Sequence, residues 1–321
     1  MFTSRLILER VKMEFEYQPI KLNEPTRIES PQHSISRKPW KNKVLNKLYS
    51  LLERKLLGIS DNLEIYESTY PTPIQTEYPE NNVGRVRYYK ASGNSAVIIL
   101  PQRGRGYNFA QLIASYLATN GISTYEIEAP LRESRFPDGV KSFYDLPIDL
   151  SKLKTRFRQA VTETRGLIDL VEEENVGICG VSLGAIYASI VYGIDERVSS
   201  ACLIMAGGNL VEMVFESNDK FARFLRDSLV KNGISKEELK REVEDIEPRN
   251  YAKPHKSKNL LMINGHLDKE VPLRYALELC DSWGNPEQIL VSAGHLSIVV
   301  NTAKLLSKIL DHYKRTLSDL S

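Results

Sequence analysis

From residue 83 onward, short apolar segments alternate with longer amphipathic ones, and this alternation limits the possible folds more than any other feature. The short segments, which resemble buried strands, are GRVRYYKA (84–91), SAVIIL (95–100), ISTYEIEA (122–129), NVGICGV (175–181), SSACLIMA (199–206), NLLMIN (259–264) and QILVSA (288–293). The intervening segments predict helices at 108–120, 152–173, 183–192, 273–283 and 297–317. Such an order predicts an α/β fold with a mostly parallel central sheet flanked by helices.

One segment interrupts this alternation. Residues 208–255 are mostly helical and charged, and they lack the strand that the pattern would place there, so we predict a helical lid insertion. Its apolar side chains either line an acyl pocket or pack among themselves, and the sequence does not decide between the two. These side chains are Phe215, Phe221, Phe224 and Leu225.

The residues before the alternation form a distinct region. We expect an N-terminal extension over 1–84, with a strand within 5–17 and an amphipathic helix at 40–57, followed by the main domain over 85–321. The segment 37–58 carries seven Lys or Arg and one Glu. It either rests on an anionic membrane surface or packs its leucines on the main domain with its lysines in water, and we favour the second interpretation.

The composition excludes several classes of protein. Lys and Arg total 43 against 41 acidic residues, a balance that disfavours a dedicated nucleic-acid binder. No apolar run approaches the ~20 residues of a spanning helix, and charges interrupt the first residues where a signal peptide would need an apolar stretch. The three cysteines are widely spaced, and neither a CxxC pair nor an HExxH motif occurs, so we expect no metal, no cofactor and a cytoplasmic location.

A G-x-S-x-G pattern lies between a predicted strand and a predicted helix. The segment Gly180-Val181-Ser182-Leu183-Gly184 directly follows the strand NVGIC. A serine at a sharp strand-to-helix turn exposes its hydroxyl, and flanking glycines remove Cβ atoms that would collide there. The amides at the start of the helix favour an oxyanion at the same point. This context favours a nucleophile over a simple helix cap.

A nucleophilic serine needs a base and an acid that orients the base. Asp268 follows the strand NLLMIN in the loop GHLDKEVP, and His295 follows QILVSA in the loop AGH. The order Ser, Asp, His along the chain is the one expected for a fold of this kind.

With these three motifs in order, residues 83–321 resemble an α/β-hydrolase fold serine hydrolase, similar to dienelactone-hydrolase and prolyl-oligopeptidase-like esterases. The resemblance implies that Ser182 is the nucleophile, His295 the general base and acid, and Asp268 the orienting carboxylate. It predicts a carboxylesterase acting on small or medium esters. A peptidase or amide hydrolase with the same triad, and a non-catalytic binding protein on this scaffold, are the alternatives.

The loop after the strand SAVIIL departs from the pattern of that family. Pro101-Gln102 stands where many relatives have His-Gly, so the backbone amide of Arg103, or of Gln102, would join that of Leu183 in an oxyanion hole. Arg105 and Arg132 are candidate substrate-binding residues near the site. Loop charges of this kind are more often solvated than clamped on an anionic substrate.

Overall fold

The computed structural model describes residues 15–17, 19–28, 58–60, 62–103, 109–140, 143–146, 149–295, 297–298 and 302–318. The helix predicted at 40–57 lies outside the described residues. The strand predicted within 5–17 also lies outside them, except for its last three residues.

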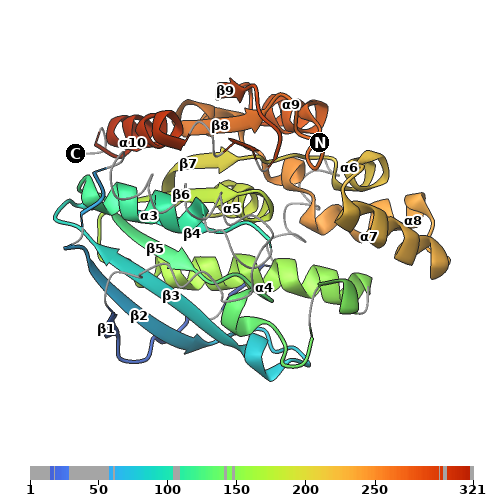
Figure 1. The fold of residues 1–321 in the computed structure, drawn as a ribbon, viewed down its shortest axis with the longest axis horizontal. Helices are drawn as coiled ribbons and strands as arrows, with labels where there is room; N and C mark the ends of the chain where they lie inside the picture. The colour runs from blue at the N-terminus through green and yellow to red at the C-terminus, as the bar shows by residue number, and fades with distance from the viewer. Residues whose placement is uncertain are drawn as a thin grey trace.

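In the described part of the chain, nine strands form one sheet in the order β1-β2-β3-β5-β4-β6-β7-β8-β9 (Figure 1). The pairs β1-β2, β2-β3 and β3-β5 are antiparallel. The remaining pairs, β5-β4, β4-β6, β6-β7, β7-β8 and β8-β9, are parallel. The strands are β1 Thr26–Ile28, β2 Glu64–Pro71, β3 Val83–Lys90, β4 Ser95–Leu100, β5 Ser123–Ile127, β6 Asn175–Val181, β7 Val198–Ile204, β8 Leu260–Gly265 and β9 Glu287–Val291. The predicted mostly parallel sheet is confirmed.

Helices cover both faces of the sheet because side chains alternate along each buried strand. In β4, Ile98 and Leu100 belong to the buried cluster that also contains side chains of α4 Leu150–Ile168, α5 Leu183–Ile194 and α9 Leu273–Ser282. Val97 and Ile99 point to the other face and pack with α3 Phe109–Thr119 and α10 Thr302–Ser318. The strands are therefore apolar on both sides, as the continuous apolar runs of the sequence indicated.

The predicted helix at 152–173 differs at both ends from the observed α4. Asp149 caps the helix by accepting hydrogen bonds from the backbone amides of Ser151 and Lys152, so α4 begins at Leu150. At its other end Glu173 accepts hydrogen bonds from two tyrosine hydroxyls of the sheet, those of Tyr88 and Tyr125. These contacts place residue 173 at the sheet rather than in a further helical turn.

The insertion between β7 and β8 is helical, as expected. It contains α6 Leu210–Glu216, α7 Lys220–Lys231 and α8 Lys236–Glu242. Figure 1 shows these helices together at one side of the view, beyond the parallel strands. Short 3-10 helices lie at Pro79–Asn82, Glu133–Arg135, Phe143–Asp145, Glu244–Ile246, Pro248–Tyr251 and Pro254–Asn259.

The sheet continues across the boundary expected at residues 84–85. β2 pairs with β3 along its whole length, from Glu64 opposite Lys90 to Pro71 opposite Val83. Tyr70 of β2 is fully buried, and its hydroxyl donates a hydrogen bond to Glu163 in α4. Part of the predicted extension thus shares the core of the main domain.

Candidate active site

Ser182 occupies a strained turn between β6 and α5. Its backbone has φ 54° and ψ −118°, values that a residue with a Cβ rarely adopts. The turn leaves no room for side chains on either flank. A Cβ on Gly180 would lie 2.4 Å from Ala185 Cα, and one on Gly184 would lie 2.2 Å from the carbonyl oxygen of Leu100. Both glycines of the motif are therefore required by close backbone contacts.

The structure brings the three predicted catalytic side chains together. Ser182 Oγ lies 2.8 Å from His295 Nε2, and His295 Nδ1 lies 2.7 Å from Asp268 Oδ2. They meet because each follows the carboxyl end of a strand in the same parallel sheet, β6, β8 or β9. The other carboxylate oxygen of Asp268 accepts hydrogen bonds from the amides of Glu270 and Val271, both at 2.9 Å. The acid is thereby held in one orientation toward the imidazole.

The charges around His295 favour its protonated form. Burial opposes the imidazolium, but the hydrogen bond and charge of Asp268, with the charge of Glu270, outweigh it and raise the pKa of His295 above 6.5. Glu270 Oε2 lies 3.7 Å from His295 Nε2, too far for a hydrogen bond but close enough for a Coulomb interaction. An imidazole in this setting is a good acceptor for the proton of a neighbouring hydroxyl.

The backbone around Ser182 suits an oxyanion. Leu183 is the first residue of α5, so its amide lies at the positive end of the helix dipole. The loop that follows β4 approaches the same turn closely, because the carbonyl oxygens of Leu100 and Pro101 lie 2.2 and 2.5 Å from the position of a Cβ on Gly184. The amides of Gln102 and Arg103 follow directly in this loop.

Of the two arginines predicted to bind substrate, the structure describes only Arg132. Arg132 is 4% exposed and does not line the cavity described below, with its guanidinium 3.8 Å from Glu133. Arg105 lies outside the described residues. The binding roles of both remain predictions.

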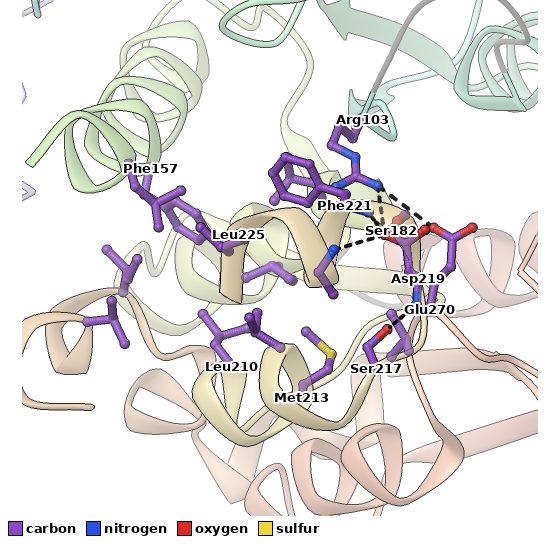
Figure 2. A pocket seen from close by; sticks show the side chains of 18 of the residues that line it. Arg103, Phe157, Ser182, Leu210, Met213, Ser217, Asp219, Phe221, Leu225 and Glu270 are labelled. Carbon is purple, nitrogen blue, oxygen red and sulfur yellow. Dashed lines mark hydrogen bonds and ion pairs between the residues drawn. The ribbon is translucent and has the colours of Figure 1, made fainter. Parts of the chain in front are cut away.

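Arg103 forms a charged cluster at the site that sequence reasoning did not foresee (Figure 2). Its guanidinium lies 3.5 Å from Asp219, 3.9 Å from Glu270 and 3.8 Å from the centre of the Phe221 ring. Burial raises the pKa of Glu270, and Arg103 and His295 oppose that shift. The sequence had placed Arg103 near the site through its backbone amide, and Glu270 lies two residues after Asp268. Asp219 and Phe221 come from the insertion, and nothing in the sequence indicated their contact with Arg103.

An apolar cavity of about 190 Å³ extends from Ser182 beneath the helical insertion. Figure 2 shows Leu210, Met213 and Leu225 of the insertion and Phe157 of α4 arranged along it. Of the four insertion side chains whose role the sequence left open, Phe221 and Leu225 line this cavity, whereas Phe215 and Phe224 do not. Phe224 packs edge-on against Tyr144 instead. Further apolar lining side chains are Leu153, Ile186, Val211, Val214, Leu229, Leu239, Val243 and Ile246.

No group of three or more His, Cys, Asp or Glu suited to a metal ion occurs among the described residues. In the same part of the chain, no helix is both long enough and apolar enough to cross a membrane.

Two solved structures share this architecture over nearly the whole chain. An acetyl xylan esterase from Paenibacillus sp. R4 is 14% identical with a TM-score of 0.65, and the match covers 95% of this chain and 93% of that one. Acetyl xylan esterase 1 from Thermoanaerobacterium sp. JW/SL YS485 is 15% identical with a TM-score of 0.64, covering 97% and 93%. The fold is that of an α/β hydrolase. We call the sharp strand-to-helix turn at Ser182 the elbow.

Sequence comparisons add less. No protein-family model matches the chain. An uncharacterized protein of Bacillus subtilis (strain 168), YdjC, is 27% identical over 95 residues, which are 30% of this chain and 82% of that protein. A third structure, acylaminoacyl peptidase from Pyrococcus horikoshii, is 12% identical with a TM-score of 0.57, and the match covers 80% of this chain but only 48% of the peptidase.

Proposed function

We propose that the protein is a serine hydrolase that cleaves carboxylic esters through an acyl-enzyme. The observation that carries this proposal is the continuous hydrogen-bonded chain from Ser182 Oγ through His295 to Asp268, with links of 2.8 and 2.7 Å. A nucleophile, a base and an orienting acid in this order are the groups that acyl transfer requires.

His295 Nε2 takes the proton of the Ser182 hydroxyl as Oγ attacks the ester carbonyl, and the imidazolium is stabilised by Asp268. The amide of Leu183, with that of Arg103 or Gln102, donates hydrogen bonds to the tetrahedral oxyanion. His295 then gives its proton to the departing alkoxide as the C–O bond breaks. A water molecule attacks the acyl-enzyme, His295 accepts its proton, and the acid is released with Ser182 restored.

Three observations favour small or medium esters as the substrate. The cavity next to Ser182 is lined mostly by apolar side chains, which suits an acyl chain. The insertion α6 to α8 covers this cavity, so we assign it the role of a lid. The two structures similar over nearly the whole chain bear the name of esterases. The peptidase neighbour supports the amide-hydrolase alternative less well, because half of that chain has no counterpart here.

The cellular location of the protein is part of the same proposal. Cys179, Cys202 and Cys280 are all free and buried, as expected of thiols in a reducing environment. We therefore propose a cytoplasmic enzyme whose partner is a small-molecule ester rather than a nucleic acid.

The test combines covalent labelling with turnover. A fluorophosphonate probe is expected to label Ser182, and p-nitrophenyl butyrate is expected to be hydrolysed faster than the matched p-nitroanilide. Ser182→Ala is expected to lose both signals while keeping its melting temperature. Ser282→Ala is the control, since this serine does not line the cavity and, among the described residues, its hydroxyl donates to the carbonyl of Glu278. Folded wild-type protein that neither turns over the ester nor takes the label would overturn the proposal.

A further inference from the structure

One charged side chain in the cavity has no role in the mechanism above. Arg156 of α4 lines the cavity beneath the lid. The three other basic residues of the same stretch of helix each reach a carboxylate: Lys152 with Glu77 at 2.7 Å, Lys154 with Asp245 at 3.0 Å and Arg158 with Asp245 at 3.1 Å. Within the described residues, Arg156 forms no hydrogen bond or ion pair. It is thus the exception on a helix whose other charges are compensated.

A second polar group lies close to Arg156. Tyr187 of α5 also lines the cavity, and its ring packs edge-on against Phe157, with ring centres 4.9 Å apart. Burial raises the pKa of Tyr187, and the positive charge of Arg156 opposes this rise more than that of Arg103 does. The guanidinium of Arg156 and the hydroxyl of Tyr187 are therefore close enough to interact electrostatically. The Tyr187 hydroxyl donates to no atom of the described residues. Besides the polar residues around Ser182, the cavity therefore contains two donors that bond to no acceptor in the described residues.

The acids that line the cavity do not serve Arg156. They are Asp219 and Glu270, and both contact Arg103 near Ser182. Burial lowers the pKa of Arg156, and the opposing effects of Tyr187, Tyr78 and Glu77 do not outweigh it. A partly buried cation without a partner reduces stability, whereas an anion beside it would recover a charge-assisted hydrogen bond. A ligand in the cavity could supply such an anion.

We infer that the cavity binds an acyl chain whose far end carries a carboxylate, held by Arg156 and by the hydroxyl of Tyr187. This inference rests on the proposed function, since it names the substrate class of the same site. The acyl side of the ester is the part that stays on Ser182 until water arrives, so it is the part that the covered cavity would retain. The guanidinium provides the paired donors that a carboxylate accepts, and the many apolar side chains that line the same cavity suit the methylene chain.

The decisive assay compares two esters that differ only at the chain end. These are the mono-p-nitrophenyl ester of suberic acid and p-nitrophenyl octanoate. The suberate chain is long enough that its free carboxylate does not attack its own ester through a small ring. The wild type is expected to favour the suberate ester about 10- to 100-fold in kcat/KM, the range of a hydrogen bond to a charged group. Arg156→Met is expected to bring the ratio close to one, mainly by losing activity on the suberate ester.

The control is Lys154→Met, which removes the same charge from the same helix at a residue that does not line the cavity. It is expected to keep the wild-type ratio. Arg156→Met is also expected to keep or raise the melting temperature, because it removes an uncompensated cation, whereas a structural arginine would lower it. A wild type without preference, or an unchanged ratio in active Arg156→Met, would refute the assignment.

If neither ester is hydrolysed and the probe leaves Ser182 unlabelled, the proposed function fails and the anion site is judged by binding alone. Free suberate at millimolar concentration is then expected to raise the melting temperature of the wild type but not of Arg156→Met, with octan-1-ol as the uncharged comparison. Equal shifts, or none, for the two proteins would show that Arg156 does not bind the carboxylate.

Discussion

Replacing Gly184 with alanine tests whether the loop after β4 supplies half of the oxyanion hole. The added Cβ would lie 2.2 Å from the carbonyl oxygen of Leu100 and 2.5 Å from that of Pro101. Both obstacles are backbone atoms, so no side chain can swing aside to accommodate the methyl group. The amides of Gln102 and Arg103 follow immediately, and they move with this segment.

The size of the effect follows from these distances. To reach an ordinary contact of 3.4 Å from 2.2 Å, the loop and the helix start must separate by about 1.2 Å. A hydrogen bond to the oxyanion does not survive such a displacement, and losing one donor costs about 100- to 1000-fold in kcat. Overpacking a tight site costs about 1–3 kcal/mol of stability, so the protein is expected to remain folded.

The assay is kcat for p-nitrophenyl butyrate together with the urea midpoint, and the control is Gly177→Ala. Gly177 lies on the same strand as the start of the elbow, and its Cβ would lie 2.9 Å from the ring of Tyr313, away from the loop. The control is expected to lose stability but little kcat. If Gly184→Ala is folded and as active as Gly177→Ala, the loop does not supply an oxyanion donor.

Three further changes test the acid, the charge near the base, and the buried core. Asp268→Asn is expected to lower kcat by about 10,000-fold with little change in KM, because the imidazole loses its orientation and its charge partner; a loss below tenfold contradicts the assigned role. Activity is expected to fall as the pH decreases through the raised pKa of His295, above 6.5. Glu270→Gln is expected to move this acidic side of the pH–activity profile to lower pH, because it removes a negative charge 3.7 Å from Nε2. A profile that stays in place or moves to higher pH argues against that coupling. Glu163→Gln is expected to cost about 3–5 kcal/mol in urea unfolding, since it leaves the fully buried guanidinium of Arg135 without its carboxylate; an unchanged midpoint would count against this.

Much of the fold was predictable because its signals are local. The strands β4, β6, β7 and β8 are continuous apolar runs, and the turn at Ser182 is marked by its own neighbours, Gly180 and Gly184. The candidate catalytic residues were predictable for a related reason. Parallel strands end at the same edge of the sheet, so residues that follow them are brought together whatever their separation along the chain.

The insertion shows where local signals end. Its helices were expected. However, the contacts of Asp219 and Phe221 with Arg103 depend on how α7 packs over the sheet. No periodicity in the sequence encodes a distance between residue 103 and residue 219.

The sequence by itself determined the order of strands and helices from β3 onward, the elbow at Ser182, and the positions of Asp268 and His295 at strand ends, because each depends on a few consecutive residues. The strands β1 and β2 were not predicted. Only the tertiary structure decided which charges are compensated. Lys154 and Arg158 meet Asp245 of the insertion, while Arg156 between them lines the cavity and forms an ion pair with none of the described carboxylates. Whether a charge finds a partner depends on the packing of distant segments, and three basic residues on one helix look alike until that packing is known.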